Sequence, residues 1–309
     1  MPEREGIMQP EIEHLKRERI REIMMTWGCS PQLEMISWRP GSEAARPETP
    51  IIVLVHGAGH TAMHWQYMQR LFAQAGYHSL AVNLRGHGQS EGRSRILQNT
   101  LQEYIDDVRG FLHEQVRPRP YVLIGHSMGG YIVQGVCQQE QDNTPLGVAL
   151  LASTTPKLSK RVGTSPELIL TLLRHPGAAL HSFRTHDTLL RTAQQVRDVF
   201  FSPQAAHEMV QFCFEHMQSE SLRPTQQFKQ FPSPENGGPH PTVSVLIMGA
   251  EQDKMVPPQL VKATADAYGT TPIMFPRMGH DLMLDADHEE VAVALMDWIE
   301  HLLGKGNVQ

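Results

Sequence analysis

The stretch Tyr121-Val122-Leu123-Ile124-Gly125-His126-Ser127-Met128-Gly129-Gly130 decides how this chain folds. Its four leading apolar residues predict a buried strand, and residues 130–136 have the pattern of a helix. The Gly-x-Ser-x-Gly sequence between them predicts a turn that is too tight for large neighbouring side chains. We expect this turn to lift the hydroxyl of Ser127 above the end of a sheet, where it can attack a carbonyl carbon.

A second strand and its loop lie upstream of this turn. The apolar run Ile51–Val55 leads into His56-Gly57-Ala58-Gly59-His60, a loop whose glycines leave backbone N–H groups accessible. Fixed donors that face the negative oxygen of a tetrahedral intermediate lower its barrier, by about 3 kcal/mol for one donor. We expect the N–H groups of Ala58 and Met128 to form such an oxyanion hole.

An acid and then a histidine follow the serine, each after a predicted strand. Residues 243–248 lead into a loop that contains Asp253, and residues 272–275 lead into a turn that contains His280. A serine hydroxyl needs an adjacent base, for which we choose His280, and that base needs a carboxylate to orient it. We expect Asp253 to supply the carboxylate; Glu251 and Asp281 are its rivals.

Taken in order, these segments resemble the α/β-hydrolases, in the group that includes carboxylesterases and monoacylglycerol-lipase-like enzymes. The resemblance runs from about Leu33 to Leu303 and includes residues 83–90, Asn-Leu-Arg-Gly-His-Gly-Gln-Ser. The chain order Ser, Asp, His is typical of that fold. One departure is Asn83, where many relatives carry Asp; that position is usually structural.

The rest of the chain predicts an α/β fold, with a mostly parallel sheet and helices on both faces. Short strands alternate with helices except over residues 153–241, which have helical patterns and no convincing strand. We therefore expect a core domain of residues 1–152 and 242–309, and a helical cap (lid) of residues 153–241 inserted between two sheet strands. Near the N-terminus, residues 10–21 look helical. Residues 22–27 fit either an extension of that helix or, as we prefer, a strand paired with residues 33–38.

The lining of the substrate pocket is harder to predict. Residues 203–217 should form a cap helix with one apolar face toward the cleft, and flexible methionines suit a pocket for varied acyl chains. The spacing of His56, His60 and His64 suggests a metal, but Gly57 and Gly59 spoil a helix there, so we expect no metal site. The residues expected at the pocket are His56, Gly57, Trp65, Met209, Cys213 and Met255.

Composition excludes several classes of partner. The 309 residues carry a formal net charge of −6, which does not favour binding to nucleic acid or to an anionic membrane. The three cysteines, Cys29, Cys137 and Cys213, are odd in number and widely spaced, which argues against a disulfide framework or a zinc module. The first thirty residues are charged and contain no apolar leader core. We expect a soluble, cytoplasmic monomer or homodimer.

These features favour a serine hydrolase that cleaves carboxylic esters with small to medium apolar acyl groups and needs no cofactor. Two alternatives stay open. The same triad could hydrolyse a carbon–carbon bond or carry out perhydrolysis, and a substrate carboxylate would then need a cation such as Arg184, Arg191 or Arg197. The fold could also serve as a non-catalytic small-molecule-binding protein.

Overall fold

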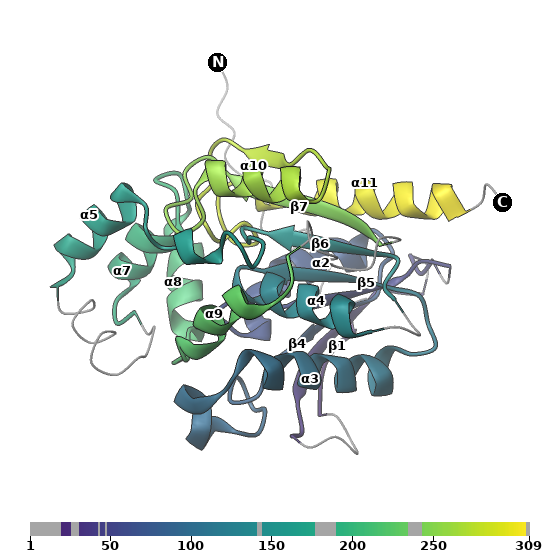
Figure 1. The fold of residues 1–309 in the computed structure, drawn as a ribbon. Helices are drawn as coiled ribbons and strands as arrows, with labels where there is room; N and C mark the ends of the chain where they lie inside the picture. The colour runs from purple at the N-terminus through teal and green to yellow at the C-terminus, as the bar shows by residue number, and fades with distance from the viewer. Residues whose placement is uncertain are drawn as a thin grey trace.

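The computed structural model describes residues 20–25, 31–42, 44–46, 48–140, 144–176, 190–233 and 243–306. Its centre is an eight-stranded sheet of order β1-β2-β4-β3-β5-β6-β7-β8 (Figure 1). The strands β3 to β8 pair in parallel, whereas β1 and β2 are antiparallel to their neighbours. The strands are β1 (Ile20–Met25), β2 (Glu34–Arg39), β3 (Ile51–Val55), β4 (Ser79–Val82), β5 (Tyr121–His126), β6 (Gly147–Leu151), β7 (Ser244–Ala250) and β8 (Ile273–Phe275).

The N-terminal hairpin follows the preferred prediction. Strand β1 pairs with β2 in an antiparallel register that sets Ile23 opposite Ile36. Of the segment expected to be helical, residues 10–19 lie outside the described residues, and Ile20 and Arg21 belong to β1. A helix was the wrong expectation at those two positions, because pairing with β2 outweighs a local helical pattern there.

Helices cover both faces of the sheet, as expected of parallel strands. In β3, Ile52 and Leu54 belong to one apolar cluster, and Ile51, Val53 and Val55 belong to the other. The first cluster packs against α2 and α11, and the second against α3, α4 and α10. These helices are α2 (Gln66–Gln74), α3 (Leu101–Phe111), α4 (Met128–Gln139), α10 (Pro258–Ala267) and α11 (His288–Gly306), and the short helices η1 (Ala62–Trp65), η2 (Arg93–Gln98) and η3 (Leu112–Val116) join them.

A helical insertion separates β6 from β7. Figure 1 shows α5, α7 and α8 grouped to one side of the sheet, away from the far end of α11. Buried apolar residues of the insertion, such as Val196 and Val210, belong to the same cluster as the sheet residues. The elements of the insertion are η4 (Ser159–Arg161), α5 (Pro166–Arg174), α7 (Ala193–Phe200), α8 (His207–His216), α9 (Arg223–Gln227) and η5 (Phe228–Gln230).

Asn83 has a structural role that suits an amide. Its Oδ1 accepts the backbone N–H of Ala62 at 2.7 Å, and its Nδ2 donates to Glu34 Oε2 at 2.7 Å. Both Asn83 and Glu34 are buried. An ionised aspartate at this position could not donate to Glu34 and would set two carboxylates together. The amide is therefore matched to the acidic neighbour.

The turn between β5 and α4 brings backbone segments too close for any side chain. A Cβ on Gly129 would lie 2.3 Å from Val55 O and 2.7 Å from His56 O. A Cβ on Gly125 would lie 2.4 Å from Gly129 O. The two flanking glycines are therefore required by close packing of β3, β5 and α4.

We expect Gly129→Ala to lower the free energy of unfolding by about 3 kcal/mol, because the added methyl group must push backbone oxygens apart. Urea denaturation of the two proteins measures this difference. Gly304→Ala is the matched control: the position is helical and has no atom within 4 Å of an added Cβ. That control should be stabilised by roughly 0.5–1 kcal/mol. Equal stability of Gly129→Ala and the parent would contradict the packing argument.

Candidate active site

Ser127 occupies a strained backbone position at the start of α4. Its φ of 52° and ψ of −117° lie outside the regions that a serine ordinarily adopts. Hydrogen bonds hold this conformation on both sides: Ser127 N–H donates to Leu151 O at 2.9 Å, and Ser153 Oγ donates to Ser127 O at 2.8 Å. The strain is thus maintained by β6 and by the segment that follows it.

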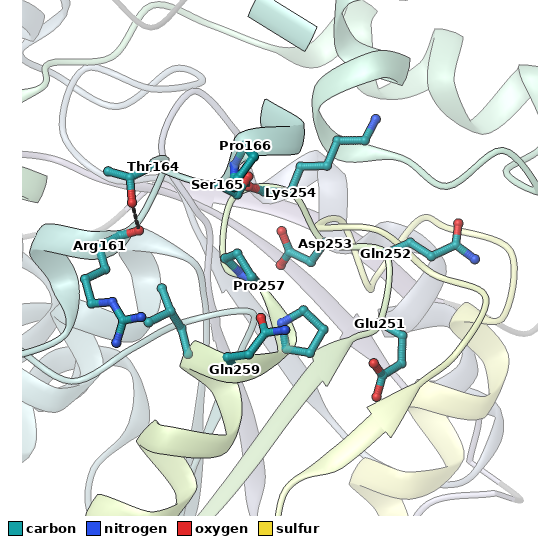
Figure 2. Close-up of a pocket in the computed structure, with 12 residues that line it drawn as sticks. Arg161, Thr164, Ser165, Pro166, Glu251, Gln252, Asp253, Lys254, Pro257 and Gln259 are labelled. Atoms are coloured by element: carbon teal, nitrogen blue, oxygen red, sulfur yellow. Dashed lines mark hydrogen bonds between the residues drawn. The ribbon is translucent and has the colours of Figure 1, made fainter. Parts of the chain in front are cut away.

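His280 is bound to the carboxylate predicted for it. Its Nδ1 lies 2.8 Å from Asp253 Oδ2. The other oxygen, Oδ1, accepts the backbone N–H groups of Met255 and Val256 at 2.8 and 2.9 Å. Asp253 is therefore held by its own loop while it orients the ring. Its rival Glu251 is exposed, and Figure 2 shows the Glu251 carboxylate lying away from that of Asp253.

The electrostatics of His280 reflect two opposing effects. Burial disfavours the charged ring, but the neighbouring carboxylates of Asp253 and Asp281 outweigh burial and raise the pKa of His280 above its ordinary value. At His126 the balance is reversed: burial, together with the neighbouring His280 ring, outweighs the Asp281 carboxylate and holds the pKa of His126 well below the ordinary value. His280 is thus the better proton acceptor of the two.

Ser127 and His280 line one cavity of about 480 Å³. The backbone N–H groups of Ala58 and Met128, expected to form an oxyanion hole, belong to residues on the same wall. Seven further lining residues are apolar or aromatic and come from the insertion and from α4. These are Tyr131, Val162, Leu168, Leu190, Val199, Phe200 and Leu222.

Of the residues expected at the pocket, Met255 lines this cavity and five others do not. His56 is fully buried; its Nδ1 donates to Gly57 O, and its Nε2 accepts the N–H of Leu84. Trp65 is fully buried in the core, because η1 turns its ring toward the sheet. Gly57 lies behind the wall, where an added Cβ would be 3.1 Å from Ser127 Cβ.

The cap-helix residues are also placed differently from the prediction. Helix α8 packs with Met209 against the sheet cluster, and the thiol of Cys213 donates to Asp281 Oδ2 at 3.3 Å. Burial and the adjacent Asp281 carboxylate raise the pKa of the Cys213 thiol well above its ordinary value. The apolar face of α8 therefore contacts the turn behind His280 rather than the cavity.

Several lining residues were missed, because their positions depend on tertiary contacts. Phe200 of α7 stacks on the His280 ring, with centroids 5.7 Å apart, and its carbonyl accepts the N–H of His280 at 2.7 Å. A Cβ on Gly279 would lie 2.6 Å from that carbonyl oxygen. This close approach explains the Gly-His pair in the sequence, although the pair alone does not identify Phe200 as its partner.

His60, which also lines the cavity, and Asp281 form a buried pair. His60 Nε2 lies 3.0 Å from Asp281 Oδ2, and His60 Nδ1 lies 2.9 Å from Ala58 O. Both neighbours of the ring, a backbone carbonyl and a carboxylate, are hydrogen-bond acceptors. Burial opposes the Asp281 charge, but His60 outweighs it and holds the pKa of Asp281 far below its ordinary value.

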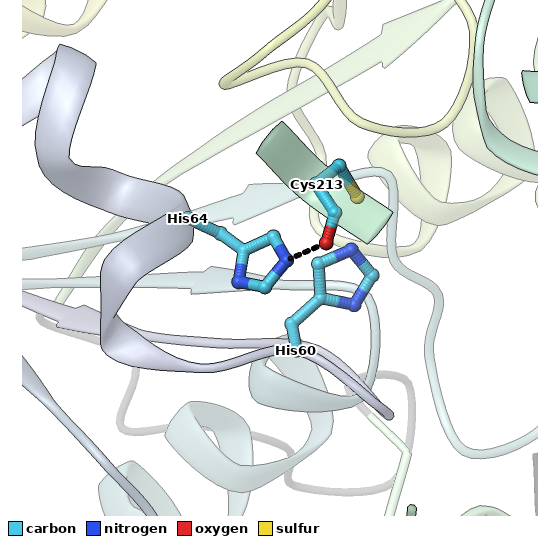
Figure 3. Close-up of side chains that lie close together, drawn as sticks. All are labelled: His60, His64 and Cys213. Carbon is cyan, nitrogen blue, oxygen red and sulfur yellow. Dashed lines mark hydrogen bonds between the residues drawn. The ribbon is translucent and has the colours of Figure 1, made fainter. Parts of the chain in front are cut away.

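His60, His64 and Cys213 lie close enough together to suggest a metal site (Figure 3). Both nitrogens of His64 have other roles. Its Nδ1 accepts the N–H of Thr61 at 3.0 Å, and its Nε2 donates to Cys213 O at 3.2 Å. Burial and the nearby His60 hold the pKa of His64 well below its ordinary value. This set of side chains is therefore arranged for hydrogen bonding between η1 and α8.

A second cavity, of about 640 Å³, borders the loop that contains Asp253 (Figure 2). Its lining includes Arg161, Glu251 and Lys254, but neither Ser127 nor His280. It therefore does not give access to the serine. No helix in the described part of the chain is long and apolar enough to cross a membrane.

Comparisons with known proteins bear on the fold of the chain. A sequence model of the alpha/beta hydrolase family matches residues 52–294. Protein phosphatase methylesterase 1 of Bos taurus is 29% identical over 34% of this chain and 28% of its own length. Epoxide hydrolase A of Mycobacterium tuberculosis is 30% identical over 37% of this chain and 35% of its own length. The chain thus spans about a third of these curated relatives.

The structural match covers far more of the chain. The solved structure of a thermophilic esterase from Thermogutta terrifontis has a TM-score of 0.65 and 18% sequence identity. It covers 92% of this chain and 99% of the esterase chain. At this identity the match establishes the shared fold.

The burial of the Asp281 carboxylate beside His60 predicts a loss of stability when the carboxylate is removed. Asp281→Asn should lower the free energy of unfolding at pH 7 by about 3 kcal/mol, because His60 and Cys213 then lose the buried carboxylate that accepts their hydrogen bonds. Since the pKa of Asp281 is lowered on folding, the stabilisation is present above the pKa of an unfolded aspartate, about 3.9, and is lost as the pH falls further. Denaturant titrations between pH 3 and pH 7, chosen as roughly bracketing that value, measure it.

Asp297→Asn, at an exposed position on α11, is the matched control and should change stability by less than about 0.5 kcal/mol. Similar effects from the two substitutions would argue against a buried ion pair.

Proposed function

The chain belongs to the alpha/beta hydrolase family, and from this premise we propose that it is a serine hydrolase of carboxylic esters. The observation that carries the proposal is the hydrogen bond between Asp253 and His280, with His280 and Ser127 on the wall of one cavity. Ser127 is the proposed nucleophile, His280 the base and Asp253 the orienting acid. The names of the relatives, a methylesterase and an epoxide hydrolase, agree with hydrolysis in general.

The proposed reaction proceeds in two halves. Ser127 Oγ attacks the ester carbonyl carbon while its proton passes to His280 Nε2, and the carbonyl oxygen becomes an oxyanion. The N–H groups of Ala58 and Met128 donate to that oxyanion, and the N-terminus of α4 adds a favourable field. His280 then gives its proton to the oxygen of the departing alcohol. The acyl group stays bound to Ser127 Oγ as an acyl-enzyme.

Water completes the cycle. His280 takes a proton from water as the water oxygen attacks the acyl carbon, and it returns the proton to Ser127 Oγ as the acid departs. The apolar lining from Leu168, Leu190 and Val199 supports acyl groups that are small to medium and apolar. We also propose that the helical insertion acts as the cap that encloses them.

Serine at position 127 disfavours the epoxide-opening reaction named for one relative. Relatives with that chemistry are expected to carry Asp as the nucleophile in the elbow, whereas this chain has Ser127. A serine alkoxide forms an acyl ester that water hydrolyses readily at the carbonyl. The elbow residue thus favours acyl transfer.

A fluorophosphonate probe tests the nucleophile directly. We expect labelling at Ser127 in the folded protein and none in Ser127→Ala, with Asp253→Asn lowering turnover of a 4-nitrophenyl ester about 10⁴-fold. Peptide mass mapping locates the adduct. Ser94→Ala, at an exposed position, is the matched control and should label as the parent does. A folded parent that forms no adduct would instead favour a non-catalytic binding protein.

The raised pKa of His280 sets the pH dependence of the reaction. The neutral ring is the base, so kcat/KM should rise with pH and reach half its plateau above pH 6.5, roughly the ordinary value for histidine. Asp253→Asn should move this midpoint down, because it removes a carboxylate that favours the charged ring. Initial rates between pH 5 and pH 9, roughly centred on that value, measure both midpoints. An upward shift in Asp253→Asn would contradict the assignment.

A further inference from the structure

Two segments at the mouth of the active-site cavity differ in charge from the rest of the chain. These mouth segments, residues 152–166 and 221–233, supply eight of the residues that line the cavity. The whole chain has 33 acidic and 27 basic residues. The mouth segments have no Asp or Glu, and their basic residues are Lys157, Lys160, Arg161, Arg223 and Lys229. Even when Glu167 and Glu220, which directly adjoin these segments, are included, basic residues outnumber acidic ones here, in contrast to the chain as a whole.

Lys160 and Lys229 bring this charge to the cavity itself. Lys160 belongs to η4 and Lys229 to η5, and these short helices pack against each other. Both lysines are exposed and both line the cavity that holds Ser127. The described lining includes no acidic side chain, and neither lysine forms an ion pair with a described residue. Their positive potentials therefore add at the mouth.

The cavity lining thus offers contacts for different parts of one molecule. Leu168, Leu190 and Val199 give an apolar wall, whereas the ammonium groups of Lys160 and Lys229 offer donors for an anion. A neutral ester would make no use of those charges. We propose that the substrate is an anionic ester, with a carboxylate on its acyl or alcohol part that Lys160 and Lys229 bind while Ser127 attacks the ester carbonyl.

This inference rests on the proposed ester hydrolysis and adds the charge of the substrate to it. Because both ammonium groups are exposed, each contact with a carboxylate is weak on its own. The two together should favour an anionic ester by roughly fivefold in kcat/KM. Salt should reduce the preference, since exposed charges are screened.

Two pairs of chromogenic esters test the inference. Mono-4-nitrophenyl glutarate and 4-nitrophenyl pentanoate differ by a carboxylate on the acyl side. The ester 5-butanoyloxy-2-nitrobenzoate and 4-nitrophenyl butanoate differ by a carboxylate on the alcohol side. For each pair, the ratio of kcat/KM for the anionic ester to kcat/KM for the neutral ester is measured in the parent and in a Lys160→Met, Lys229→Met double variant. Comparing the two ratios cancels the intrinsic reactivity of each ester.

We expect the double variant to lose roughly fivefold in kcat/KM for the anionic ester of at least one pair, with the neutral esters changed less than about twofold. Raising the salt from about 20 mM to about 0.5 M should reduce the parent's ratio and leave the variant's ratio unchanged. Lys262→Met, an exposed lysine on α10 outside the cavity lining, is the matched control and should behave as the parent does.

The outcomes separate the two proposals. Neutral esters hydrolysed through Ser127, with ratios equal in the parent and the double variant for both pairs, would overturn the inference and leave ester hydrolysis intact. Absence of hydrolysis of all four esters, together with absence of fluorophosphonate labelling, would overturn the proposed function and the inference with it.

Discussion

One buried carboxylate connects the parts of the site. Asp281 pairs with His60 in the loop after β3 and accepts the thiol hydrogen of Cys213 in α8, and His126 Nε2 lies 3.7 Å from its other oxygen. These partners come from the proposed oxyanion loop, from the insertion and from the end of β5. Since the backbone of Asp281 continues directly from His280, its anchoring also fixes the position of the proposed base. The charge is stabilised here because His60 and Cys213 donate to Oδ2 and the His126 ring lies near Oδ1.

The sequence was most informative where chemistry depends on local geometry. The strand before Gly125, the tight turn at Ser127 and the order of Asp253 and His280 are each visible within a few residues. The close contacts of Gly125 and Gly129 with neighbouring backbone explain why that local pattern is so specific. The parallel sheet was likewise predictable, because fully apolar runs such as Ile51–Val55 must be buried on both faces.

The cavity lining was less predictable, because it depends on how distant segments pack. Trp65 follows the proposed oxyanion loop in the sequence, and Cys213 lies on the apolar face of a cap helix. Both are nevertheless buried and do not line the cavity. Leu190 and Lys229 line the cavity but belong to no motif, and only the packing of the insertion brings them there. The spacing of His60 suggests a metal ligand; its pairing with Asp281, which is 221 positions away in the chain, is visible only in the structure.

The backbone contact between Phe200 and the His280 turn attaches the end of α7 to the proposed base. Because the Phe200 carbonyl accepts the N–H groups of His280 and Asp281, the end of α7 cannot swing outward without disturbing the proposed base. Ser202 reinforces this attachment through two hydrogen bonds to Asp285. Residues of η4 and α9 also line the cavity. For directed evolution, libraries that randomise those lining residues can reshape selectivity, whereas randomising the α7 end would disturb the proposed base and lower turnover along with it.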